Sequence, residues 1–199
     1  MKKIILSYLL TVFLVNMSYT QQSIGTLKQL EDCVNRPNYQ SEGCPDLEYL
    51  TYVRDVDNRL DKFVGIWKGT YNGKIYTFKF NKRIKYGSGK GLYRDLLIGR
   101  MQVQDSNGKV VYNTLSESDD DKTYFFGKNF QRNTYMMNLI INTACNDSGV
   151  VFMEVYSNQP NKMRIYFDRD KIWYNPERCP NYETYQTTLP QNSIFVIKQ

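Results

Sequence analysis

Apolar and polar residues alternate in short runs over most of the chain, starting at Phe63. The clearest run is Lys74–Lys85, in which Tyr76, Phe78 and Phe80 alternate with polar side chains. A period of two residues is typical of a β-strand with one buried face. The pattern predicts nine strands: Phe63–Tyr71, Lys74–Lys85, Leu92–Gln104, Val110–Leu115, Lys122–Phe130, Tyr135–Asn142, Val150–Ser157, Met163–Asp168 and Ser193–Lys198.

Turn residues separate these runs. Asn72-Gly73 and Asn107-Gly108 each stand between two alternating runs, and both residue types tolerate positive φ. We therefore predict two tight hairpins with two-residue type I′ turns. Because no long helical pattern lies between the runs, the chain is expected to be all-β, an antiparallel meander that closes into a barrel or packs as a sandwich.

The first 20 residues have the pattern of a signal peptide. Two lysines precede the apolar run Ile4–Val15, and Ser18 and Thr20 predict cleavage before Gln21. The run is too short for a stable membrane anchor, although an uncleaved anchor is the alternative. The first cysteine, Cys33, lies far beyond it. We therefore expect an exported protein, periplasmic or secreted, with no lipid anchor and no transmembrane segment after processing.

The segment that follows, residues 21–60, differs from the rest of the chain because it is polar and holds two cysteines and two prolines. It is expected to be irregular and closed by a disulfide, with a short helix around residues 54–62. The helical spacing rests on four residues: Leu50, Val53, Val56 and Leu60. Residues 61–199 are expected to form the β domain.

Four cysteines occur in the chain: Cys33, Cys44, Cys145 and Cys179. Export places them in an oxidising compartment, where disulfides are expected. Three pairings are possible, and we favour Cys33–Cys44 and Cys145–Cys179 because each closes a local segment that contains turn residues. A zinc site with four thiolates is the alternative, but the chain has no C-x-x-C pair. We expect no metal site.

The run Phe63–Thr70 resembles the first strand of lipocalin-like (calycin) barrels, in which a Gly-x-Trp sequence follows a short helical turn. Gly65 and Trp67 hold those positions. The resemblance implies a barrel of about eight or nine strands with the tryptophan packed across its closed end. In lipocalins a basic residue from a late strand covers the ring, and Lys198 is the candidate here. We expect Trp67 to be buried against the last strand, near Val196 and Lys198.

Longer stretches resemble a family of uncharacterised exported proteins from Bacteroidota, a domain of unknown function. The similar stretches are Asp61–Trp67, Tyr93–Gly99, Val111–Leu115 and Leu189–Gln199. The resemblance covers residues 55–199. Some members carry a lipoprotein cysteine, which this chain lacks. The family has no established activity, so the resemblance implies a fold and a compartment but no chemistry.

Histidine is absent from the chain, which removes Ser-His-Asp and Cys-His nucleophilic sites. The glycine-rich stretch Gly87–Gly91 lacks the residues of a phosphate-binding loop and stands between strands, so it is interpreted as a hairpin loop. The acidic cluster Glu117–Asp121 lacks the spacing and the glycine of a calcium loop and is interpreted as a solvated turn. We identify no catalytic residues and expect no cofactor.

A row of aromatic residues is the first candidate site: Trp67, Tyr76, Phe78 and Phe80. On alternate positions of neighbouring strands, they could line a ligand cavity at the barrel end or fill a solid core. Small barrels are usually filled by side chains, which favours the core.

A basic stretch with interleaved aromatics is the second candidate: Lys79, Lys82, Arg83 and Lys85. It could bind an anionic ligand, but a solvated strand face that discourages edge-to-edge aggregation is the favoured interpretation. The formal net charge is +6, and it falls to +4 without the two lysines of the predicted signal peptide. Such a mild excess does not imply nucleic acid, which is not an expected partner.

Three functional hypotheses follow. The first is a non-enzymatic binding module that holds a small apolar or amphipathic ligand in or beside the barrel. The second is an envelope or extracellular interaction protein with a filled barrel and a basic surface patch. The third is a glycan hydrolase that uses two carboxylates. A lumen, an exposed patch and a pair of facing carboxylates, respectively, would distinguish them.

Overall fold

The computed structural model of the chain describes residues 23–87, 91–119, 124–171 and 176–199. The predicted signal peptide, residues 1–20, lies outside the described residues. None of the helices in the described ranges is long and apolar enough to cross a membrane.

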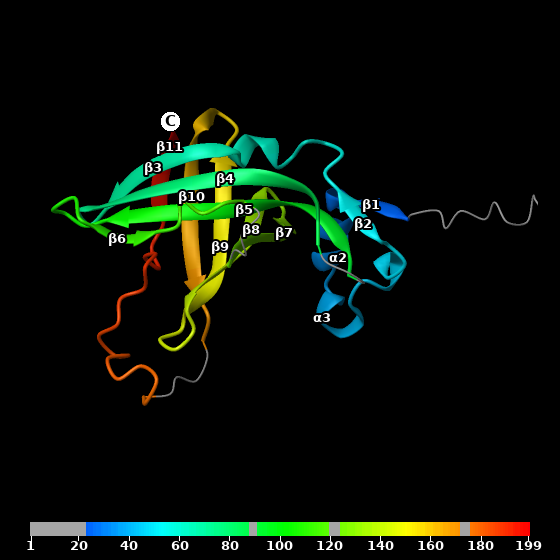
Figure 1. Cartoon of the computed structure of the whole chain (residues 1–199). Helices are drawn as coiled ribbons and strands as arrows, with labels where there is room; N and C mark the ends of the chain where they lie inside the picture. The colour runs from blue at the N-terminus through cyan, green and yellow to red at the C-terminus, as the bar shows by residue number, and fades with distance from the viewer. Residues whose placement is uncertain (1–22, 88–90, 120–123, 172–175) are drawn as a thin grey trace, which may run out of the picture.

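Eight antiparallel strands form a closed barrel (Figure 1). Around the ring their order is β5-β4-β3-β11-β10-β9-β8-β7, and β7 returns to β5 through the pair Ile98–Phe126. The alternation left a barrel and a sandwich open, and the barrel that the calycin resemblance implies is confirmed. The bounds are β3 Gly65–Tyr71, β4 Lys74–Tyr86, β5 Tyr93–Gln104, β7 Phe125–Gln131, β8 Thr134–Asn142, β9 Asp147–Tyr156, β10 Gln159–Arg169 and β11 Ile194–Lys198.

Three shorter strands extend the sheet beyond the ring. β6 (Val110–Asn113) pairs with the end of β5, while β1 (Ile24–Thr26) and β2 (Tyr52–Arg54) add parallel pairs next to the start of β5. The parallel pairs were not predicted, because strands of three residues are too short to show a period.

The N-terminal segment is more ordered than predicted. Its helix is α2, Leu27–Val34, and begins with a capping box in which Thr26 and Gln29 exchange hydrogen bonds. The helix predicted around residues 54–62 is wrong. The Asp55 carboxylate accepts hydrogen bonds from the backbone of Arg59 and Leu60 and so stabilises a turn there. The segment also contains α3 (Tyr39–Glu42) and the 3₁₀ turns η1 (Pro45–Leu47) and η2 (Asp61–Phe63).

One of the two predicted tight turns is confirmed. Asn72 and Gly73 have φ of 47° and 74° and join the paired residues Tyr71 and Lys74, as a two-residue type I′ turn requires.

The second turn differs from the prediction. Only Gly108 has positive φ, its amide donates to the Asp105 carbonyl, and Asp105 pairs with Lys109 across a three-residue loop. The Asp105 carboxylate also accepts from the Asn107 and Lys109 amides, which stabilises this wider turn.

Large side chains fill the barrel. The inward residues of β4 are Tyr76, Phe78 and Phe80, and their rings lie in a stacked row with centroids 6.5 and 5.9 Å apart. Phe125 meets Phe80 edge to face at 5.6 Å. The core interpretation of the aromatic row therefore agrees with the packing. Further fully buried members come from the opposite wall: Met137, Val151, Met153, Met163, Ile165 and Phe167.

The antiparallel order gives the barrel two unlike ends. We define the closed end by the start of β3 and the end of β11, with η2 beside them. We define the mouth by the β3–β4 and β8–β9 turns and by the strap, residues 182–192, which precedes β11. In Figure 1 the strap belongs to the orange and red coil at the lower left.

Both favoured disulfides are present, Cys33–Cys44 and Cys145–Cys179. The first joins α2 to the loop before η1, and the second joins the β8–β9 turn at the mouth to the chain that leads into the strap. The described residues therefore include no free cysteine.

Candidate binding site at the barrel mouth

A pocket of about 420 Å³ lies at the mouth, between the β3–β4 hairpin and the strap. Its volume is within the range of small-molecule sites. Tyrosines, side-chain amides and a single charged residue, Lys74, make up most of the lining. The lining residues are Tyr71, Asn72, Lys74, Tyr76, Tyr185, Gln186, Thr187, Pro190, Gln191 and Asn192.

Tyr76 forms the floor of this pocket. Its ring belongs to the core and is 3% exposed, yet its hydroxyl makes no hydrogen bond to any residue in the described ranges. Burial raises the pKa of the Tyr76 phenol, and the neighbouring Tyr71 adds to the shift. The hydroxyl therefore stays protonated at neutral pH and can donate to a ligand.

Tyr71 and the strap form one wall. Tyr71 is the last inward residue of β3, and its hydroxyl accepts a hydrogen bond of 2.8 Å from the Asn192 side chain. The buried Leu189 anchors the strap in the core. The pocket is thus held between a barrel strand and a segment without regular structure.

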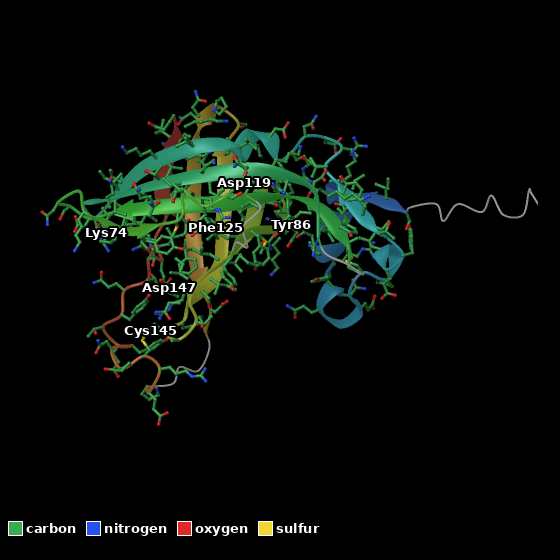
Figure 2. The ribbon with its side chains drawn as sticks, viewed as in Figure 1. Lys74, Tyr86, Asp119, Phe125, Cys145 and Asp147 are labelled. Carbon is green, nitrogen blue, oxygen red and sulfur yellow. A yellow bond between two sulfur atoms is a disulfide. The ribbon has the colours of Figure 1, made fainter. Side chains whose placement is uncertain are left out.

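Asp147 holds the other part of the strap. It is fully buried at the start of β9, and one carboxylate oxygen accepts from the Tyr185 hydroxyl, the Thr188 amide and the Thr188 hydroxyl at 3.1, 2.9 and 2.7 Å. Burial raises the pKa of the Tyr185 phenol, and the charge of Asp147 and its hydrogen bond raise it further. Figure 2 shows Asp147 and Cys145 at this side of the barrel, close to the strap.

The second oxygen of Asp147, Oδ1, is buried and has no hydrogen-bond partner among the described residues. An unpaired buried carboxylate oxygen costs free energy. The cost is tolerated here beside the pocket, at the point where the Cys145–Cys179 disulfide fixes the β8–β9 turn. This oxygen is a buried acceptor at the mouth that no described residue uses, although Asp147 itself does not line the pocket.

The closed end is built differently. Trp67 is fully buried, and its indole NH donates to the Phe63 carbonyl at 2.7 Å. Lys198 pairs with Trp67 across β3 and β11, and its ammonium lies 5.3 Å from the ring centroid. Gly65, with φ of 124°, permits this approach, because a Cβ there would stand 3.0 Å from the Lys198 side chain. The burial of Trp67 against the last strand agrees with the expectation.

An ion pair seals this end from outside. Arg59 lies over the Phe130 ring at 4.0 Å and pairs with Glu31 of α2 at 2.7 Å. Beneath it, Phe63, Phe130 and Tyr135 form a cluster whose ring centroids lie 4.8 to 6.2 Å apart.

The four predicted aromatic residues are therefore divided between two environments. Tyr76 lines the mouth pocket, whereas Trp67 lies toward the closed end. Phe78 stands opposite Trp67 in the register, and Phe80 stands opposite Gly65, nearer the closed end. A ligand-binding role for any of them stays a prediction.

The structure does not gather the predicted basic residues into one patch. Lys82 continues the inward row of β4 and forms ion pairs with Asp55 at 2.9 Å and Asp61 at 2.7 Å. Burial lowers the pKa of Lys82, but the hydrogen bonds and charges of Asp61 and Asp55 outweigh burial, and the pKa is raised. Lys85 lies 5.8 and 5.7 Å from two tyrosine rings. Lys79 and Arg83 are on the opposite, outward face of β4.

The described residues of the acidic cluster contact the outer face of the barrel. Glu117 pairs with the buried Arg100 at 2.7 Å, and Asp119 accepts from the Asn81 amide. Asp120 and Asp121 lie outside the described residues. The two described acids thus hold a loop against β4 and β5.

Sequence reasoning missed Asp147 and the strap tyrosine Tyr185. Asp147 stands in a polar turn sequence, and nothing local indicates that it becomes buried. The proline and amide composition of residues 185–192 indicates only a loop. The one usable signal was the pair Cys145 and Cys179, which predicts that the chain before the strap lies near the β8–β9 turn.

Among the described residues, hollows of about 690 and 370 Å³ also lie on the outer wall. Both are lined by outward residues of β8 and β9, including Phe152 and Glu154. Neither reaches an inward residue of the barrel, which distinguishes them from the mouth pocket.

Comparison with known proteins gives one match. The sequence model of a family of unknown function, DUF6705, matches residues 1–199. No curated protein and no solved structure matches the chain.

Proposed function

We propose that the chain, which belongs to the DUF6705 family, is a non-enzymatic binding module that holds a small amphipathic ligand in the mouth pocket. The observation that carries the proposal is the Tyr76 hydroxyl, a protonated donor on the pocket floor that has no partner among the described residues. Tyr76 lines the pocket, so its hydroxyl can donate a hydrogen bond to a ligand bound there.

The lining chemistry supports an amphipathic ligand over a purely apolar one. Tyrosine rings offer apolar contact, while the side chains of Gln186 and Gln191 and the ammonium of Lys74 offer hydrogen bonds. Phe78 and Phe80 fill the barrel below Tyr76, so the ligand rests at the mouth and a long acyl chain has no channel to enter. The described lining includes no carboxylate, so this pocket gives no support to a two-carboxylate glycan hydrolase.

The same proposal includes export to the periplasm or the exterior without a lipid anchor. The two disulfides support it, since such bonds persist in oxidising compartments.

Native mass spectrometry of the protein purified from its own host tests the proposal. The wild-type protein is expected to retain a small ligand, and Tyr185→Ala is expected to lose it because the substitution removes part of the pocket wall. Tyr49→Ala is the matched control, since Tyr49 is 67% exposed and far from the lining. A wild-type protein without bound mass, or equal retention by Tyr185→Ala, would contradict the proposal.

The filled interior favours one second candidate, an interaction protein that uses its outer surface. The basic hairpin is a poor surface for this purpose, because Lys82 faces inward and is paired with two aspartates. A different part of the barrel wall meets the requirement better.

A further inference from the structure

The outer wall formed by β3 and β11 exposes large apolar side chains. Ile66, Phe195 and Ile197 are 48%, 48% and 49% exposed. They alternate with the inward residues Trp67 and Val196, so all three point away from the core. We call this surface the β3–β11 face; its two strands are labelled side by side in Figure 1.

Lysines surround these apolar residues in the sheet register. Lys79 stands opposite Ile66, and Ile197 stands between Lys68 and Lys162. Residues opposite one another in neighbouring strands point to the same side, so the lysines and the apolar residues share one surface. The Lys162 ammonium also lies 5.0 Å from the Phe195 ring.

The charges of the three lysines are not neutralised locally. None of them forms an ion pair with any residue that the structure describes, although other lysines and arginines of the barrel do. The neighbouring acids have other partners: Glu154 pairs with Arg164 at 2.9 Å, and Glu117, beyond Lys79, pairs with Arg100 at 2.7 Å. Asp168 lies further along β10, toward the mouth. The face therefore combines a half-exposed apolar centre with an unpaired cationic rim.

We propose that the β3–β11 face docks the protein onto an anionic lipid surface. Apolar side chains gain free energy by entering the boundary between headgroups and acyl chains, and lysines nearby gain from anionic headgroups. A protein partner and a nucleic acid fit this face less well than a lipid surface. Protein interfaces are depleted of lysine, and a polyanion such as nucleic acid gains little from isoleucine.

Vesicle co-sedimentation tests the proposal independently of the mouth pocket. The probes are vesicles of phosphatidylcholine alone and of phosphatidylcholine with phosphatidylglycerol. The wild-type protein is expected to bind the anionic vesicles, and binding should weaken as salt rises because the lysine charges are screened. Lys68→Gln with Lys162→Gln should weaken it by about 25-fold, since one lysine contributes a factor of about five.

The apolar centre is tested by Phe195→Ser with Ile197→Ser, which should weaken binding by at least about tenfold. Val111→Ser with Lys109→Gln is the matched control, because Val111 is 54% exposed on β6 at another part of the wall. Circular dichroism checks that each variant is folded. Failure of the wild-type protein to bind anionic vesicles, equal binding by either test variant, or binding only to an acidic protein or a polyanion would overturn the proposal.

Discussion

The two ends of the barrel use similar aromatic residues, but their most deeply buried polar groups differ in hydrogen bonding. At the closed end, the Trp67 indole donates to a carbonyl and the Tyr135 hydroxyl accepts from the Leu97 amide. At the mouth, Asp147 Oδ1 is buried without a hydrogen-bond partner among the described residues, and Tyr76, whose hydroxyl has no partner among them either, lines the pocket. Buried polar groups with hydrogen-bond partners make a structure more rigid. Buried polar groups without partners lower stability, and in natural proteins such exceptions are expected at functional sites.

This difference indicates that the two ends of the barrel have different roles. Under the proposed function, the closed end contributes stability and the mouth holds the ligand. Substitutions at the closed end should therefore change unfolding and spare the ligand, whereas substitutions at the mouth should remove the ligand at a smaller cost in stability.

The largest expected effect is at Trp67. Replacing it with alanine should lower the free energy of unfolding by about 3–5 kcal/mol, because a large ring is lost from a fully buried site. Urea unfolding measures the change. Ile66→Ala, one residue away and half exposed, is the control and should cost much less. Near-native stability of Trp67→Ala would refute the assignment of stability to this end.

The two disulfides come next. Removing Cys145–Cys179 by a double substitution to serine should cost about 4 kcal/mol, and removing Cys33–Cys44 about 3 kcal/mol, because the closed loops span 34 and 11 residues. Only the first should also release the ligand, since it fixes the turn beside Asp147. Equal ligand loss in both double variants would show that the effect is not specific to the mouth.

A smaller effect concerns alkaline pH at the closed end. Burial, the hydrogen bond to Asp95 and its charge raise the pKa of Tyr52 from 10.0 to about 12. A group whose pKa is higher in the folded state stabilises below its unfolded pKa, and the contribution disappears as pH rises through the folded value. Stability should therefore fall between pH 10 and about 12.

Tyr52→Phe should be less stable near neutral pH and should lose less stability over that alkaline range. The urea midpoint is measured from pH 10 to about 12 for the wild-type protein and for Tyr52→Phe, and its slope against pH is compared. Tyr39→Phe, at an exposed tyrosine, is the control. Identical slopes for wild-type protein and Tyr52→Phe would contradict this role of Tyr52.

The sequence allowed the closed end to be predicted better than the mouth. Trp67 lies in a strand whose alternation fixes its face, and closure of a barrel brings the first and last strands together, so Lys198 could be placed beside it. The turn at Asn72-Gly73 could also be predicted, because both residue types tolerate the positive φ that a type I′ turn requires. These features are local or follow from closure alone.

The mouth depends on long-range packing that no local pattern encodes. Asp147 and Thr188 meet only because β9 begins where the strap crosses the barrel. Lys82 was grouped with its neighbours in sequence, but its strand period turns it inward to Asp55 and Asp61. The helix α2 was predictable from the capping box at Thr26, a signal that the weaker spacing of residues 50–60 obscured.

The most direct test of the central claim is a crystal structure of the protein purified from its own host with its retained ligand. We expect ligand density in the mouth pocket, with a polar ligand atom at hydrogen-bond distance from the Tyr76 hydroxyl, and an unchanged closed end around Trp67. Ligand density deep inside the barrel beside Phe78 and Phe80, or on the outer wall with the mouth pocket empty, would contradict this placement.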